Sequence, residues 1–317
     1  MEEIGGYIGL DTYMMPMLHE NATVALNSAS SCLAYLIRAK NIKKIALPKF
    51  MCASAKTVCD RENIITRFYS VGMDFIPEDL CLEEDEWIYV VNYYGQLGNS
   101  ILALLVKKYT SIIIDNVQAY YQMPLPGVDT IYTCRKFFGV TDGAFLYTDT
   151  LLNRDLPQDE SYNRMGFILG RYERTASEFY KEYKANNDML IMEPVKKMSK
   201  LTYNLLHGID YMFVKNRRTE NFKYLYNTLK DINKLELKIP EGAFMYPLYI
   251  ENGAEIRKKL CGEKIYIPLF WDDVFDICLP SETEYIMAMD ILPLPTDQRY
   301  TVQVMQYIVS KIKEYIR

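Results

Sequence analysis

The first half of the chain alternates between two patterns of apolar and polar positions. Short apolar runs rich in β-branched and aromatic residues predict strands at 44–48, 66–71, 87–92, 111–115 and 144–148. Longer stretches with helical spacing predict helices that begin near residue 28, at 50–59 and at 102–109. Strands that alternate with helices favour a parallel sheet with covered faces, and ligands bind beyond the carboxyl ends of such strands.

The second half changes character. Residues 164–235 look largely helical, with helices expected at 167–183 and 198–229, and the Arg217–Arg218 pair is interpreted as part of a solvated helix face. From about residue 236 the elements shorten to a strand at 244–250, a helix at 256–260 and an extended stretch at 265–271. One apolar face marks the last helix, at Val302, Met305, Ile308, Ile312 and Ile316.

This pattern predicts an α/β protein of two domains. The large domain covers residues 1–235, with a mostly parallel sheet and a helical connection at about 164–235, and the smaller α/β domain covers 236–317. With 317 residues, half of them apolar, the chain can bury a large core. Residues 1–20 are expected to form an irregular arm, and 78–86 an acidic, solvated connector.

Composition narrows the choice of partners and location. The formal net charge is −5 and Lys and Arg are spread along the chain, so no basic stripe suggests a nucleic-acid partner. No apolar run approaches the ~20 residues that span a bilayer, and the acidic start does not resemble a signal peptide. Seven cysteines without paired spacing fit a reducing cytoplasm, and two distant histidines, His19 and His207, argue against a histidine metal site. We therefore expect a cytoplasmic protein without a metal or a membrane partner.

Small residues precede the first helix at Asn27-Ser28-Ala29-Ser30. Asn27 or Ser28 is expected to cap this helix. Small side chains let an anion approach the free N–H groups, and the helix dipole favours negative charge there. The stretch is consistent both with a phosphate-binding turn and with a helix that is simply well capped.

Asp115 and Lys136 are the main candidates for chemistry. Asp115 ends a β-branched strand, and Lys136 lies in an apolar, aromatic run before a turn at 139–143. Taken singly, Lys136 fits a surface lysine beside a hairpin, and Asp115 fits a cap or turn residue. Together they fit the two residues that hold pyridoxal phosphate (PLP). A neutral lysine amine forms a Schiff base with the aldehyde, and a carboxylate keeps the ring nitrogen protonated.

At these positions the chain resembles the DegT/DnrJ/StrS family of PLP-dependent sugar aminotransferases, which have the aspartate-aminotransferase fold (fold type I). The resemblance spans most of the chain and is best in the first half. Segments in the family's order carry it: Asn27–Ser30, Val91–Gln96, Asp115–Ala119, Lys136–Gly143 and Leu292–Pro295.

The resemblance implies a role for each matching residue. Lys136 forms the Schiff base and moves a proton between substrate carbon and cofactor, Asp115 pairs with the pyridine nitrogen, and Gln118 contacts the region of the ring hydroxyl. Backbone N–H groups at Ala29 and Ser30, with the Ser30 hydroxyl, bind the phosphate, in a cradle that Ser28 begins. Thr133 adds another donor, although the family's serine sits differently relative to the lysine.

The chain also departs from the family pattern. Cys52 occupies the place of an aromatic residue that stacks on the cofactor ring, so either this smaller side chain or Phe50 takes that role. Asn92 replaces a histidine, and Ala29 replaces a glycine, which requires a negative φ at Ala29.

The activity implied is transfer of an amino group, from glutamate, to a keto-sugar attached to a nucleotide. Family members work as homodimers with active sites at the interface. Two alternatives stay open: a non-catalytic relative that kept the fold as a binding or regulatory protein, and a PLP-dependent sugar dehydratase, in which the family replaces the lysine. The sugar and the pathway, surface-polysaccharide or antibiotic-sugar synthesis, stay open as well.

Overall fold

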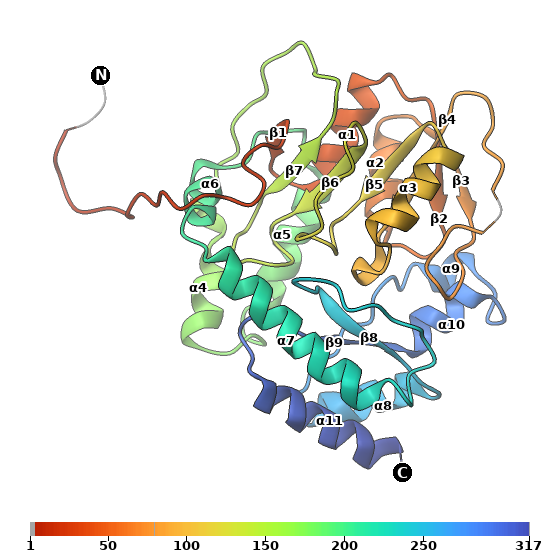
Figure 1. The fold of residues 1–317 in the computed structure, drawn as a ribbon. Coiled ribbons are helices and arrows are strands. Elements are labelled where there is room, and N and C mark those ends of the chain that lie inside the picture. The colour runs from red at the N-terminus through yellow and green to blue at the C-terminus, as the bar shows by residue number, and fades with distance from the viewer. Residues whose placement is uncertain (1–3, 79, 317) are drawn as a thin grey trace.

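A seven-stranded sheet in the order β1-β7-β6-β5-β4-β2-β3 forms the centre of the first half of the chain. The structure is a computed structural model that describes residues 4–78 and 80–316 (Figure 1). Strands β2 to β6 run parallel, while β7 is antiparallel to both of its neighbours, β6 and β1. The strands are β1 (Val24–Leu26), β2 (Lys44–Pro48), β3 (Ile65–Tyr69), β4 (Glu86–Val91), β5 (Ile112–Asp115), β6 (Asp129–Thr133) and β7 (Ala144–Tyr147).

Helices pack against this sheet and link it to the rest of the chain. In the first half they are α1 (Ala29–Ala39), α2 (Ala53–Arg61) and α3 (Asn99–Lys108). The middle of the chain holds α4 (Gly166–Glu173), α5 (Tyr180–Met192), α6 (Lys200–Leu206) and α7 (Tyr211–Leu229). Helix α1 lies against β6 and β7, and α5 packs on α1 and α2. Short 3₁₀ turns occur at Tyr93–Gly95 and Tyr162–Arg164.

The last part of the chain builds a second apolar core around two antiparallel strands, β8 (Met245–Tyr249) and β9 (Ile291–Pro295). Helices α8 (Gly253–Gly262) and α11 (Val302–Ile316) pack in this core, whereas α9 (Val274–Ile277) and α10 (Thr283–Asp290) bury Val274, Met287 and Ala288 in the first core. The second half of α7 also joins this core through Phe222, Leu225 and Leu229, so the long helix connects the two cores (Figure 1). A boundary at 235/236 stays a prediction.

The sequence predicted the order of elements well, with local errors. It missed β1, which has three residues, and it also missed α9, α10 and β9. The helices expected at 167–183 and 198–229 are each interrupted, and the second break falls where the Asp210 side chain accepts a hydrogen bond from Phe213 N (2.9 Å) and starts α7. The stretch 265–271 forms no strand. Its end, Trp271, has a positive φ of 60° and packs its ring into the larger core.

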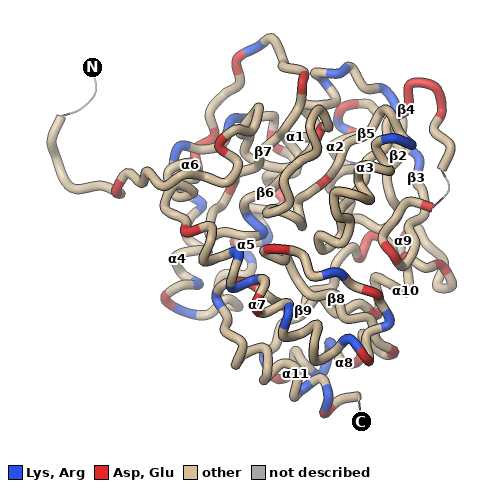
Figure 2. Tube along the Cα trace, in the orientation of Figure 1, with Lys and Arg blue, Asp and Glu red and all other residues tan. Residues whose placement is uncertain are grey.

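The first described residues of the expected arm lead away from the body (Figure 1), whereas its later part is bound to α6 and the residue that ends it: Asp11 O accepts a hydrogen bond from Asn204 Nδ2 (2.8 Å), and Met15 N donates to the His207 carbonyl oxygen (2.9 Å). Residues 1–3 of that arm and position 79 of the acidic connector lie outside the described residues. His19 is fully buried: its Nδ1 lies 3.0 Å from the Tyr147 hydroxyl and its Nε2 lies 2.8 Å from the Tyr120 carbonyl oxygen. Basic and acidic residues are interleaved along the trace (Figure 2). Among the described residues, no helix has the length and apolar character needed to cross a bilayer.

Candidate active site

The parallel strands bring the predicted site residues to one edge of the sheet. In the register of these strands Val91 pairs with Asp115, and Asp115 pairs with Ile131. The ends of β4, β5 and β6 therefore lie side by side, and Lys136 follows β6 by three residues. Convergence at the carboxyl edge was the expectation from the alternating pattern.

Asp115 is a buried carboxylate held by two donors. Its Oδ2 accepts a hydrogen bond from the Tyr89 hydroxyl (2.7 Å) and its Oδ1 accepts one from Val117 N (2.8 Å). Burial raises the pKa of Asp115, while the charge of Lys136 and these two hydrogen bonds oppose that rise. Within residues 4–78 and 80–316 this carboxylate forms no ion pair.

Lys136 lies in a turn after β6, where the Cys134 carbonyl accepts hydrogen bonds from the N–H groups of Phe137 and Phe138, both at 2.9 Å. Solvent reaches its side chain, yet the surrounding protein atoms lower its pKa by desolvation, which is the largest influence on it. The charge of Asp115 opposes that shift. Each of the two residues acts on the other's pKa, so the amine and the carboxylate occupy one site.

Helix α1 presents its N-terminus as the sequence predicted. Ser28, not Asn27, is the cap: its Oγ accepts a hydrogen bond from Ser31 N (3.1 Å). Ala29 opens the helix with a negative φ, which meets the condition set by the loss of glycine. The N–H groups of Ala29 and Ser30 have no acceptor among the described residues, as expected of the first helical turn. They are available to an anion.

Gln118 and Thr133 already have partners in the protein. Gln118 is buried and its Oε1 accepts a hydrogen bond from Tyr94 N (2.8 Å), which holds Tyr94 at a positive φ of 53°. The Gln118 Nε2 has no acceptor within the described part of the chain, so it is free to donate. The Thr133 hydroxyl donates to the Gly143 carbonyl oxygen at 3.4 Å, which leaves it a poor donor to a further ligand.

Gly143 joins the start of α1 to the lysine segment. Its N–H donates to the Asn27 carbonyl oxygen (2.7 Å), and its own carbonyl accepts from Cys134 N (3.0 Å). Its φ is +111°, and a Cβ there would lie 2.9 Å from Thr202 Cγ2. Only glycine fits a backbone with this φ and this contact.

The two candidates for the ring-stacking residue differ in exposure. The Phe50 ring is fully buried, with its centre 4.3 Å from the ring of Trp271 and 5.2 Å from that of Tyr93. Cys52 is exposed just before α2, and its thiol is close enough to Lys136 to raise the pKa of that amine. Cys52 is thus the accessible side chain of the pair.

Arg218 was misjudged from the sequence. It is fully buried on α7, and it donates to Gln298 Oε1 (2.8 Å) and to the carbonyl oxygens of Ala243 (3.0 Å), Phe244 (3.3 Å) and Phe137 (3.3 Å). The prediction of a solvated helix face holds for Arg217 but is wrong for Arg218. The helix pattern gave no sign of this, because the acceptors come from three distant segments.

Sequence reasoning also missed Tyr89 and Arg135. Tyr89 sits on β4 in a run of apolar residues, where a single polar end could have suggested a buried hydrogen bond. Arg135 directly precedes Lys136 and interrupts an apolar stretch, a signal that was present in the sequence.

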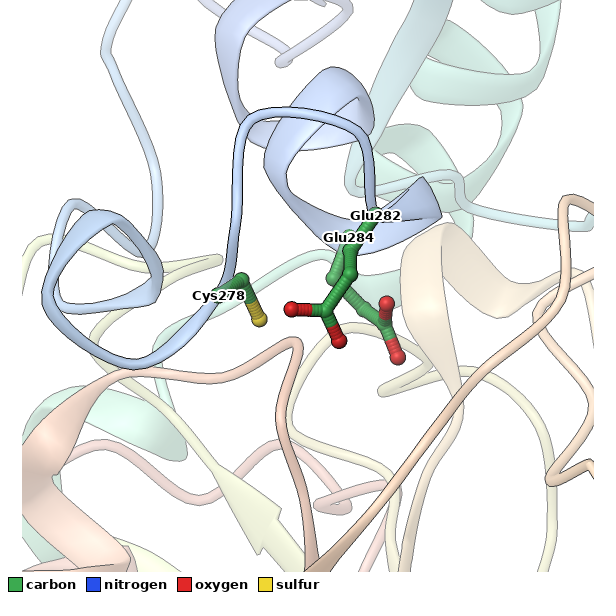
Figure 3. A group of neighbouring side chains, drawn as sticks. All are labelled: Cys278, Glu282 and Glu284. Atoms are coloured by element: carbon green, nitrogen blue, oxygen red, sulfur yellow. The ribbon is translucent and has the colours of Figure 1, made fainter.

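A separate group of potential metal ligands, Cys278, Glu282 and Glu284, lies around the start of α10 (Figure 3). Its carboxylates have partners in the protein. Glu282 pairs with the Lys49 ammonium and accepts from Leu279 N (2.6 Å), and Glu284 accepts from Val71 N (2.9 Å). We assign no metal to this group.

No family model matches the sequence, and no curated protein matches it. Solved structures do. The sugar aminotransferase CalS13 from Micromonospora echinospora has a TM-score of 0.62 at 15% identity, with 92% of this chain and 86% of that chain covered. A DegT DnrJ EryC1 StrS aminotransferase from Brucella abortus has a TM-score of 0.61 at 13% identity, with coverages of 94% and 87%. The PLP form of Spr1654 from Streptococcus pneumoniae reaches 0.64 at 15% identity, with 94% and 88%.

Identities this low establish the fold alone. The chain has the α/β fold of these aminotransferases, which confirms the fold class expected from the sequence.

Proposed function

We propose that this chain is a PLP-dependent aminotransferase that moves an amino group from an amino acid, with glutamate as the first candidate, to a keto-sugar linked to a nucleotide. The single observation that carries the proposal is that Lys136 and the buried Asp115 lie at the same carboxyl edge of the sheet, close enough for each charge to shift the pKa of the other. The fold shared with solved sugar aminotransferases supports the substrate class.

The residues of the site fit PLP. Asp115 is a buried carboxylate without an ion pair in the described part of the chain, so a protonated ring nitrogen would supply the missing countercharge. The free N–H groups of Ala29 and Ser30 suit a phosphate, and the free Gln118 Nε2 suits the oxygen of the ring hydroxyl. When bound, PLP supplies the aldehyde that takes up the amino group and the ring that withdraws electrons from the substrate carbon.

Residues of this chain tune the reactivity of Lys136 and fix the orientation of Asp115. Desolvation by the surrounding protein atoms lowers the pKa of Lys136, so a larger fraction of its amine is neutral and able to act as nucleophile and proton carrier. Tyr89 fixes the Asp115 carboxylate from one side and Val117 N from the other, which sets the direction of its remaining lone pairs. An amine whose pKa is lowered and a carboxylate held in a fixed orientation suit the two ends of PLP.

A homodimer with active sites at its interface is part of the proposal. The arm supports it, because Ile4, Tyr7 and Ile8 are 95%, 96% and 93% exposed and such apolar side chains gain from burial against a second copy. The predicted cytoplasmic location is supported by seven free cysteines, four of them buried.

A two-step assay tests the activity. The purified protein is loaded with PLP and given glutamate, and the visible absorbance is followed for conversion to pyridoxamine phosphate with release of 2-oxoglutarate. A panel of nucleotide-linked keto-sugars is then added, and mass spectrometry looks for the amino sugar. Lys136→Ala should abolish both steps, whereas Lys223→Ala, an exposed lysine on α7, should change neither.

The outcomes separate the alternatives. Gain of an amino group by a sugar supports the proposal, and loss of water without gain of nitrogen would identify a dehydratase. PLP that binds but is not converted by any amino acid would identify a non-catalytic protein.

A further inference from the structure

We infer that Arg135 binds the phosphate group of the cofactor, as a charged partner to the N-terminus of α1. The inference rests on the proposed function, because it names a further residue of the same site. Arg135 follows the end of β6 by two residues and directly precedes Lys136, and its side chain is half-buried.

The guanidinium of Arg135 has unused donors. Its Nη1 donates to Asn187 Oδ1 on α5, while its Nε is buried without any hydrogen-bond partner and its Nη2 has none in the described part of the chain. No described carboxylate forms an ion pair with it. A half-buried cation whose enclosed Nε has no acceptor, and which has no counter-ion, is costly, so this position favours an anionic ligand.

Two independent sets of contacts bring Arg135 to the start of α1. The first runs through Gly143, which is bonded to Asn27 O on one side and to Cys134 N on the other. The second runs through α5, where Leu190 O accepts a hydrogen bond from Ser28 Oγ (3.4 Å) and Asn187, one turn earlier, holds Arg135.

The chemistry of the combined site matches a phosphate. The α1 N-terminus offers the free N–H groups of Ala29 and Ser30 and the positive end of a helix dipole. Arg135 adds a full charge, and Nε with Nη2 form the edge of the guanidinium that binds two oxygens at once. Thr133 cannot supply that charge, and its hydroxyl already donates to Gly143 O.

The test compares PLP with pyridoxal, which lacks the phosphate. Wild-type, Arg135→Gln and Arg135→Lys proteins are titrated with each compound, and the dissociation constants are measured from the absorbance of the bound form and from equilibrium dialysis. Arg154→Gln, which removes an exposed arginine, is the matched control, and thermal melts check folding. Inorganic phosphate is added as a competitor.

We expect Arg135→Gln to weaken PLP binding by about 10- to 100-fold, because one charge-assisted hydrogen-bonding group is lost. The dissociation constant for pyridoxal should stay within about twofold of the wild-type value. Inorganic phosphate should compete with PLP on the wild type and much less on the variant. If Arg135→Gln does not fold, Arg135→Lys takes its place in the test. Lysine keeps the charge but cannot bind two phosphate oxygens at once, so this variant should weaken the binding of PLP and leave the binding of pyridoxal unchanged.

Equal weakening of PLP and pyridoxal, or no effect on either, would overturn the inference and assign Arg135 a structural role between β6 and α5. A wild-type protein that binds pyridoxal and PLP equally would also overturn it while leaving the proposed function intact. A wild-type protein that binds neither compound would refute the proposed function itself.

Discussion

The guanidinium of Arg218 lies 4.6 Å from the centre of the Phe137 ring and donates a hydrogen bond to the Phe137 carbonyl oxygen at 3.3 Å. Gln298 Nε2 donates to the same oxygen at 2.8 Å. Arg218 comes from α7 and Gln298 from the segment that enters α11, whereas Phe137 follows Lys136. The second core therefore fixes the peptide next to the proposed catalytic lysine.

Replacing Arg218 by lysine should destabilise the fold markedly. Burial lowers the pKa of Arg218 to about 10, and one ammonium cannot replace its fork of donors to Gln298 and three carbonyl groups. We expect a loss of about 3 kcal/mol in the free energy of unfolding, measured by urea denaturation. Arg217→Lys, one position away and paired with Glu220 at 3.3 Å, should change it by under about 0.5 kcal/mol. Equal effects from the two variants would contradict the role assigned to Arg218.

Gly143→Ala should be poorly tolerated. The backbone has a φ of +111°, and the added Cβ would meet Thr202 Cγ2 at 2.9 Å and Cys134 at 3.3 Å. Strain and crowding together predict a cost of about 3 kcal/mol in unfolding free energy. Gly139→Ala is the control, because its φ is not positive and its Cβ would lie 3.6 Å from Ile168, an ordinary contact. If the denaturation curves of Gly143→Ala and Gly139→Ala coincide, this account of the turn is refuted.

His19 should make stability depend on pH. Burial lowers the pKa of His19 to about 4, from 6.5, so between these values the unfolded chain takes up a proton that the folded chain does not. This contribution to stability is present above pH 6.5 and is lost as the pH falls toward 4. It predicts a wild type about 2 kcal/mol less stable at pH 5 than at pH 7.

In His19→Gln this part of the pH dependence should be missing, because glutamine does not titrate. Denaturation curves at pH 5, 6 and 7 for both proteins measure it. A difference between wild type and variant that stays constant over this range would show that His19 titrates normally in the folded state.

Asp115→Asn should separate cofactor binding from reactivity. An amide keeps the shape and the contact with Tyr89 but cannot balance a protonated ring nitrogen. We expect PLP to bind, and its conversion by glutamate to slow by about 100-fold in single-turnover absorbance measurements. Tyr89→Phe, which removes one donor to the carboxylate, should have a smaller effect. A rate for Asp115→Asn equal to that of the wild type would remove Asp115 from the mechanism.

Several features of the first half of the chain followed from local pattern. Strand β2 was predicted at the bounds it has, Ser28 was one of two expected caps, and Asp115 and Lys136 were expected to share a site. These features depend on short-range periodicity and on the rule that parallel strands end at one edge.

The errors come from long-range contacts. Arg218 is buried by acceptors that are distant in sequence, so its helix gave no sign of it. Gly208 and Asp210 interrupt the helix expected at 198–229, and the competing cap at Asp210 decides the break. Trp271 ends a stretch that has strand-like composition, but its ring is drawn into the aromatic cluster around Phe50, which is tertiary packing that overrides propensity.

The most direct test of the central claim is to locate the covalent bond between PLP and the chain. Wild-type protein is mixed with one equivalent of PLP, reduced with borohydride, digested and analysed by mass spectrometry. The account predicts a pyridoxyl group on the peptide that contains Lys136, and none on that peptide in an Asp115→Ala, Lys136→Ala double variant. A label scattered over exposed lysines, with Lys136 unmodified in the wild type, would contradict it.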